Sequence, residues 1–343
     1  MSTTDPVHPP LSSGYSELVR EIRGQGLLHP RPRYYLAVGA IDLAALIAVV
    51  AGLVLLRDSW WTLALAPVLA VVSTQIAFLS HDTAHSQVCR GRTRTVLCLV
   101  QGNLLSGLSY GWWVDKHNAH HAHPNDLESD PDVAVGALVF DAGQAGARTG
   151  LAAWMTRHQA GLFFPMLTFE AWNLHVSSVR AVLRPGLRHR RTEALLLLGY
   201  AVLYVALLGT TMTWPQALVF LVIHQGLVGV YLGCSFAPSH KGMPTLTPAE
   251  DADPLLRQVL SSRNILGGRF VDVALGGLNL QIEHHLFPSM PRPNLRRAQP
   301  IVERHCRAHG IPYAESTLLG SYGLALRHLH RVGAPLRAHV EDR

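Results

Sequence analysis

The chain has 343 residues, of which 48% are hydrophobic and only 15% are charged, and its mean hydropathy is +0.18. Soluble domains carry about 25% charged residues, so this composition argues against a soluble protein and predicts an integral membrane protein. The formal net charge is +6, and the positive residues are all arginines apart from Lys116 and Lys241. Basic residues in a membrane protein report its topology, so the charge gives no reason to expect nucleic-acid binding. The four cysteines include no CxxC pair, which argues against a zinc knuckle and suits a reducing, cytosol-facing protein.

The first thirty residues precede any long apolar run. Residues 1–14 contain no charged segment followed by an apolar core, so they do not form a signal peptide, and we expect them to be disordered. Residues 15–30 set Leu18, Ile22 and Leu27 against charged side chains, which predicts an amphipathic helix at the membrane interface. A solvated tail is the alternative for this segment.

Four apolar runs predict four transmembrane helices, at residues 35–56, 60–79, 194–211 and 214–236. About 20 helical residues rise roughly 30 Å, which matches the hydrocarbon thickness of a bilayer. Short turns join the first two runs and the last two, so the helices form two pairs. Asp42, the one charged residue of the first run, is either a buried hydrogen-bonded acid or a group that shapes a tunnel.

Two further apolar stretches do not qualify as spans. Residues 96–108 are short and rich in glycine and polar residues, which predicts a re-entrant or buried element. Residues 151–183 are interrupted by charged residues and by Pro165, which favours interfacial helix over a fifth span. The chain after the last span predicts a soluble cap, with helices near 249–261 and 295–309. Together these elements predict an all-α membrane protein.

We expect one domain over residues 15–325, with a cap built from residues 80–193 and 240–325, followed by a C-terminal tail at 326–343. Eleven lysines and arginines lie between residues 80 and 193 and thirteen lie from residue 240 onward, against one, Arg57, in the two outer turns. The positive-inside rule therefore places the cap and both termini in the cytosol. We expect the membrane to be a bacterial plasma membrane.

Three short histidine-rich segments follow or adjoin the apolar runs. VDKHNAHHAHPN, at residues 114–125, places His117, His120 and His121 at i, i+3 and i+4, which is one face of a helix. HDTAH contains His81 and His85, and QIEHH contains Gln281, His284 and His285. Seven of the twenty histidines lie in these three boxes, which predicts a single metal centre.

Histidine alone does not identify the metal, because imidazole suits zinc, copper, iron and nickel. A structural zinc site closes with four ligands, so seven histidines are too many for one such ion, whereas two ions with open positions would use them. Nearby carboxylates could hold the second ring nitrogen of a ligand or could be solvated loop residues: Asp82, Asp115, Asp126, Asp130 and Glu283. The sequence contains no HExxH motif and no paired Glu-x-x-His motifs.

The order HDTAH, HNAHH, QIEHH around paired spans resembles the three histidine boxes of the membrane fatty acid desaturases. The segments GGLNLQIEHHLFPSMPRPNL (276–295) and FAPSHKGMP (236–244) resemble the acyl-lipid and front-end branch of that family. The resemblance covers roughly residues 15–325. It implies four transmembrane helices, a cytosolic cap holding two iron ions, and an apolar tunnel for the acyl chain. It also implies O₂-dependent insertion of a cis double bond.

By this resemblance eight histidines would bind iron: His81, His85, His117, His120, His121, His240, His284 and His285. Gln281 is an additional candidate, because many desaturases have histidine there, and glutamine is typical of the front-end branch. The stearoyl-CoA-type branch has an asparagine four residues before the late histidine, where this chain has Phe236, so one iron could lack a ligand or use Gln281 or water.

The partners that the resemblance implies are a lipid or acyl-thioester substrate and an electron donor. Front-end enzymes often carry a fused cytochrome b5 domain, but this sequence contains no HPGG haem motif. We therefore expect a separate donor, of the ferredoxin type or a reductase. Hydroxylation of an acyl, sphingoid or carotenoid substrate is the rival chemistry. A histidine-rich metal transporter or sensor is a remote alternative, since its ligands should spread along the spans.

Some residues outside the boxes have more than one interpretation. His224 and Gln225 lie within the last span, where a role in packing or in a tunnel is favoured over metal binding. Gly229 and Gly233 indicate close helix packing. Three arginines after the third box could contact an acidic donor or lipid headgroups, or form a solvated face: Arg292, Arg296 and Arg297.

Overall fold

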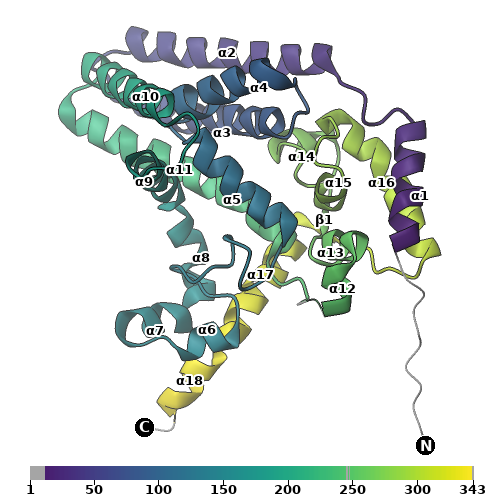
Figure 1. Ribbon diagram of the computed structural model, residues 1–343. Helices are drawn as coiled ribbons and strands as arrows, with labels where there is room; N and C mark the ends of the chain where they lie inside the picture. The colour runs from purple at the N-terminus through teal and green to yellow at the C-terminus, as the bar shows by residue number, and fades with distance from the viewer. Residues whose placement is uncertain (1–11, 245, 247, 342–343) are drawn as a thin grey trace, which may run out of the picture.

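The structure is a computed structural model that describes residues 12–244, 246 and 248–341 (Figure 1). Four helical segments are long and apolar enough to cross a membrane, which confirms the four predicted spans. They are α2 (Pro32–Leu55), the 3-10 turn η1 (Trp60–Ala64) continued by α3 (Leu65–Ala84), α10 (Arg190–Thr211) and α11 (Trp214–His240). The last span continues four residues beyond its predicted end. As predicted, the fold is that of an all-α membrane protein.

The turns that join the two helix pairs lie at the same end of the bundle. Their outer turns are joined, because Asp58 N donates to Thr211 O at 3.0 Å and Gln216 Nε2 donates to Asp58 O at 3.1 Å. Leu53 and Phe220 are fully buried in the core that the spans share. Apolar side chains such as Leu36 and Val205 are exposed, as expected of helix faces that meet lipid rather than water. The carboxyl ends of α3 and α11 therefore reach the same side of the bundle.

The segment predicted to be re-entrant or buried forms α4 (Gly91–Cys98), which continues into the π-helix η2 (Leu99–Leu105). These helices pack against α3 and α10 and do not span the membrane. A bond from Leu108 N to Gly102 O, 2.8 Å long, closes the end of η2. The chain then turns into α5 (Tyr110–Ala122), which carries the second histidine box.

Residues 151–183 fold into short helices and not into a fifth span, as predicted. The sequence from α5 to α10 contains α6 (Ala142–Gly146), α7 (Gly150–Arg157), α8 (Gln159–Leu167) and α9 (Glu170–Leu183). A Cβ atom at Gly229 or Gly233 of α11 would overlap Leu167 at the end of α8. This contact confirms that the two glycines serve close helix packing.

The rest of the cap is built from short helices and one pair of strands. They are α12 (Pro248–Ala252), α13 (Pro254–Leu260), β1 (Asn264–Leu266), α14 (Arg269–Ala274), α15 (Gln281–Leu286), α16 (Arg292–Ala308), β2 (Glu315–Thr317), α17 (Leu318–Val332) and α18 (Ala334–Glu341). The strands are parallel, with Asn264 opposite Glu315. Leu255, Ile282 and Val302 are fully buried in the cap core, which holds α15 in place.

Both ends of the chain differ from the expectation. α1 (Ser12–Gly24) buries Leu18 and Ile22 against α13 and α16, so its apolar face packs into the cap core and not into lipid (Figure 1). The expected tail at 326–343 is also part of the fold, because Leu329 is fully buried beside Phe163 and Leu167 of α8. The predicted disorder of residues 1–14 falls mostly outside the described residues. Its last three residues begin α1.

Candidate metal centre

Four separate elements bring the histidine boxes together. His81 lies in the last turn of α3 and His85 caps it, α5 carries the second box, and α15 carries the third. His240 is the last residue of α11. Because α3 and α11 pack against each other and end on the same side of the bundle, their terminal histidines face α5 and α15. All eight predicted ligands lie in this one region.

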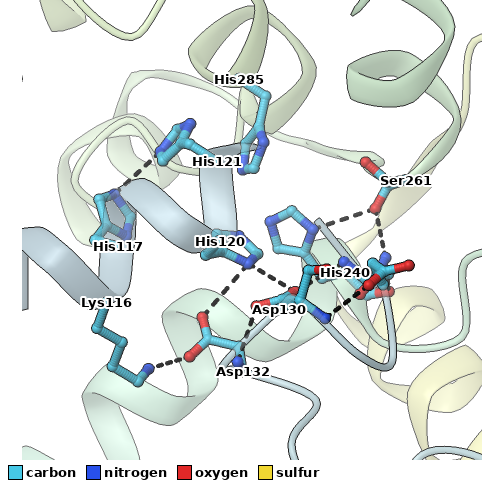
Figure 2. Close-up of polar contacts among 12 residues, drawn as sticks. Lys116, His117, His120, His121, Asp130, Asp132, His240, Ser261 and His285 are labelled. Atoms are coloured by element: carbon cyan, nitrogen blue, oxygen red, sulfur yellow. Dashed lines mark hydrogen bonds and ion pairs between the residues drawn. The ribbon is translucent and has the colours of Figure 1, made fainter. Parts of the chain in front are cut away.

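The first cluster contains His81, His85, His117 and His284, whose ligand atoms lie within 4.8 Å of one another. His117 Nε2 is 2.9 Å from His85 Nε2 and 3.0 Å from His121 Nε2. His121 therefore adjoins the first cluster, as the contact to His117 in Figure 2 shows. Four imidazoles from three elements thus form the first cluster, and His121 lies between it and the second cluster, with its ring centroid 4.3 Å from that of His285.

The second cluster contains His120, His240 and His285, again within 4.8 Å. Figure 2 shows these three rings facing one another beside α5. The side-chain amide of Gln281 lies next to them, with its Nε2 atom 2.9 Å from His240 Nε2. The structure thus brings both His240 and Gln281 to the second cluster.

Hydrogen bonds at the far side of several rings fix their orientation. His120 Nδ1 lies 2.9 Å from Asp130 Oδ2, and His285 Nδ1 lies 2.9 Å from Gln258 Oε1. His240 Nδ1 lies 3.2 Å from the carbonyl oxygen of Ser261. A carbonyl or carboxylate at Nδ1 selects the tautomer whose Nε2 lone pair is free to bind a metal, a common arrangement around metal-ligating histidines.

The inward-facing ring nitrogens are suited to metal binding. The Nε2 atoms of His81, His284 and His285 are buried and have no hydrogen-bond partner among the described residues. Such unpaired buried polar atoms are costly unless something outside the chain satisfies them. Burial lowers the pKa of His117 and His121 well below its usual value, and the neighbouring imidazoles lower it further. The His117 and His121 rings are therefore neutral at pH 7, as metal ligation requires.

An apolar cavity of about 260 Å³ runs beside both clusters. His81 and His117 of the first cluster and His120 and His240 of the second are part of its wall, together with Gln281. Most of the remaining wall is aliphatic or aromatic and comes from several elements: Leu108, Leu138, Phe163, Leu174, Leu232, Phe236 and Leu278. A long apolar substrate in this cavity would pass both histidine clusters.

The family model described as "Fatty acid desaturase" matches residues 58–317, which include all three boxes and His240. The chain belongs to the fatty acid desaturase family. Its relatives include the Acyl-lipid (9-3)-desaturase of the moss Physcomitrium patens, 34% identical over 79% of this chain and 53% of the moss protein. Others are Delta(8)-fatty-acid desaturase 2 of Arabidopsis thaliana, 28% identical over 88% of this chain and 71% of the relative, and Delta(6)-fatty-acid desaturase fat-3 of Caenorhabditis elegans, 27% identical over 94% and 76%. The chain thus spans about half the length of the moss protein.

The predicted carboxylates have different roles in this family member. Asp82 and Asp130 contact ligand rings, with Asp82 Oδ1 3.2 Å from His81 Nδ1. Asp115 is exposed on α5, and Asp126 accepts bonds from the backbone of the next turn. Glu283 accepts bonds from Tyr313 and Asn264 inside the cap, where burial raises its pKa to about 7. Two of the five candidates therefore hold a ring nitrogen.

Arg292 and Arg296 do not form the docking surface that the sequence left open. Arg292 is buried, and its Nε and Nη2 atoms lie 2.9 and 2.8 Å from Asp82 Oδ2, behind His81. Arg296 pairs with Asp272. Only Arg297 of this group is exposed. For Arg292 both interpretations were wrong, because a charged residue on a helix gives no local sign of a distant partner; the exposure of Arg297 agrees with a solvated face.

His224 lies outside both clusters, as predicted. Its ring is 2.7 Å from Tyr204 OH and 3.2 Å from Ser73 Oγ, so it is a hydrogen-bonded residue of the bundle interior. Asp42 is also buried, and its Oδ2 atom has no partner among the described residues.

Glu193, which the sequence analysis missed, holds the start of α5. Its buried carboxylate accepts bonds from Ser109 Oγ at 2.6 Å, Asn103 Nδ2 at 3.2 Å and Gly111 N at 3.2 Å. A carboxylate at a helix N-terminus is favourable, and here it anchors the helix that carries three candidate ligands. The one available signal was an acidic residue directly before a predicted span. The bond from Gln258 to His285 had no sequence signal.

Proposed function

We propose that this chain is an O₂-dependent acyl desaturase that inserts a cis double bond into a lipid acyl chain. The observation that carries the proposal is that two all-histidine clusters lie side by side on the wall of one apolar cavity. The names of the moss, Arabidopsis and nematode relatives support an acyl chain as the substrate.

The metals in this proposal are two iron ions. The first would be held by His81, His85, His117, His121 and His284, and the second by His120, His240 and His285, with Gln281 beside the second. With O₂, two electrons and two protons, such a centre supplies the oxidant that removes two hydrogens from adjacent methylenes and leaves two waters. An unactivated C–H bond requires this kind of reagent, which side chains alone do not supply.

The chain's own residues would bind and orient the substrate. The apolar wall excludes water and holds the acyl chain by burial, worth about 0.8 kcal/mol per methylene. Since methylenes offer no polar handle, the position of the double bond depends on how far the chain extends along the cavity. Asp130, Gln258 and Ser261 hydrogen-bond to three of these rings and would keep them oriented toward the second ion.

A comparison of membrane fatty acids tests this function. A host expressing the chain should accumulate a fatty acid with one additional double bond. A host expressing a His284→Ala, His285→Ala variant should not, because both clusters lose a ligand. His158→Ala, which changes a histidine outside both clusters, is the matched control. A hydroxylated product would favour the rival chemistry, and no new product from the unaltered chain would refute both.

The purified protein tests the need for an electron donor. With acyl substrate and O₂, turnover should require an added ferredoxin-type or reductase system, because we propose that the electrons come from a separate partner.

We also propose that the cap and both termini face the cytosol, in line with the charge asymmetry. In a background lacking Cys89 and Cys234, cysteines placed at Ser59 and Thr213 should react with an impermeant thiol reagent on intact cells. A cysteine at Ser129 should react only after permeabilisation, because it lies on the cap loop beyond α5. Labelling of Ser129→Cys on intact cells would reverse the orientation.

A further inference from the structure

The only two lysines of the chain meet at one aspartate. Lys116 of α5 forms an ion pair with the Asp132 carboxylate, as Figure 2 shows. Lys241, the residue after α11, donates from Nζ to the backbone oxygen of Asp132 at 2.9 Å and lies 3.9 Å from the ring centroid of Phe140. Every other fixed positive side chain in the sequence is an arginine. We refer to Lys116, Asp132 and Lys241 as the two-lysine cluster.

The two-lysine cluster is part of the wall of the cavity that passes the histidines. All three of its residues are part of the cavity wall, as are His120 and His240. The Lys116 and Asp132 side chains are 32% and 36% exposed, whereas that of His120 is 6% exposed. Other wall residues, such as Gly102 of η2 and Leu232 of α11, are buried within the bundle. The cavity is therefore charged and open at the cap and apolar toward the membrane.

The charges at the open end favour an anion. The Lys116 ammonium group pairs with the Asp132 carboxylate, whereas the Lys241 ammonium group donates to the backbone oxygen of Asp132. Asp130 is already bonded to His120 and to the backbone N–H groups of Asn125 and Asp132. Glu170 is on the same wall, where burial raises the pKa of its carboxyl and the nearby Lys116 ammonium group lowers it. Lysine also suits this task, since it is a compact point charge on a flexible stem that can follow a single anionic oxygen.

We propose that the two-lysine cluster binds the anionic head of the acyl substrate, a carboxylate or phosphate oxygen close to the start of the chain. This inference rests on the proposed function. It adds that the bound head fixes the position of the acyl chain in the cavity. With the head beside His120 and His240, only a few methylenes separate it from the histidine clusters. The double bond would therefore form at a fixed distance from the head, near the carboxyl end.

Binding of two matched probes tests the site without turnover. Purified protein in neutral detergent is titrated with oleate and with oleyl alcohol, which differ only in the charged head. We expect the Kd for oleate to be at least about tenfold lower than that for oleyl alcohol. A tenfold difference corresponds to about 1.4 kcal/mol of binding free energy. The Lys116→Gln, Lys241→Gln variant should lose this preference and retain its affinity for the alcohol. An undiminished preference in the double variant would overturn the proposal.

Three controls separate the possible causes of a lost preference for oleate. Arg307→Gln removes a cation that is 80% exposed on α16 and should leave the preference unchanged. Unaltered metal content in the lysine variant shows that the histidine clusters are intact. Oleoyl lysophosphatidate and oleoyl-CoA identify the source of the anion: the one whose affinity falls in the double variant carries the natural head, and if neither falls the site is wrong.

The position of the double bond provides a second measurement. If the head sets the position, the lysine variant should yield a mixture of positional isomers, and a single unchanged isomer would contradict the proposal. If the unaltered chain binds oleate through its lysines but forms no double bond, the proposed function fails and the binding site stands. If the unaltered chain desaturates lipid but its binding of oleate does not depend on the lysines, the proposed function stands and the proposed binding site is wrong.

Discussion

If the proposed di-iron function is right, His240→Ala should leave one iron per chain instead of two and lower turnover by more than about a hundredfold. Three histidines form the second cluster, so the loss of one leaves two imidazoles beside the Gln281 amide. Changes to groups that only orient a ligand already cost about 10–100-fold, and loss of a ligand should cost more. Phe236, one turn earlier on α11, offers no replacement donor. Iron content per chain and the rate of double-bond formation are the two measurements.

His224→Ala is the matched control for this prediction. His224 lies on the same helix but bonds to Tyr204 and Ser73 and contacts neither cluster, so this variant should retain two irons. Both variants should elute as folded protein from size-exclusion chromatography. Two irons and normal turnover in His240→Ala would show that the second cluster has been assigned wrongly. One tightly held zinc in the unaltered protein would contradict the redox function.

Arg292→Met should destabilise the protein by roughly 3–5 kcal/mol, the usual cost of removing one partner from a buried ion pair. The Asp82 and Arg292 side chains are 2% and 6% exposed, so neither water nor salt can replace the lost partner. The Asp82 carboxylate also holds His81 Nδ1, so the proposed first iron should bind more weakly. Denaturant unfolding in detergent measures the free energy, and metal analysis measures the occupancy.

Arg296→Met is the control, one turn further along the same helix. Its pair with Asp272 is 38% and 21% exposed, and such pairs contribute only about 0–1 kcal/mol. The double variant Asp82→Asn, Arg292→Met removes both charges and should recover part of the lost stability. Equal losses in Arg292→Met and Arg296→Met would show that the buried pair has no special role.

The local features of this protein could be predicted from its sequence. Each span is a continuous apolar run, and each histidine box is a helical spacing, so neither depends on distant residues. The interruption of residues 151–183 by charge and proline predicted short helices for the same reason. The prediction that His240 binds metal came from the resemblance of FAPSHKGMP to a known family, since a single histidine after a span has no pattern of its own.

The ends of the chain could not be assigned in this way. An amphipathic helix has the same pattern whether its apolar face meets lipid or protein, so Leu18 and Ile22 predicted a membrane surface where the structure has a cap core. The apolar spacing of Leu326, Leu329 and Val332 gives no sign of a distant partner, yet Leu329 is fully buried against α8.

The sequence by itself determined that this is a four-span membrane protein with a histidine-rich centre. Only the tertiary structure decided how the centre is divided. His120 and His121 are successive residues of α5, so they point about 100° apart, and His117 lies between these two directions around the helix axis. Which cluster each ring joins depends on where α3, α11 and α15 lie around α5. The same holds for Arg292 with Asp82 and for Lys116 with Asp132 and Lys241, since packing brings together residues that the chain keeps apart.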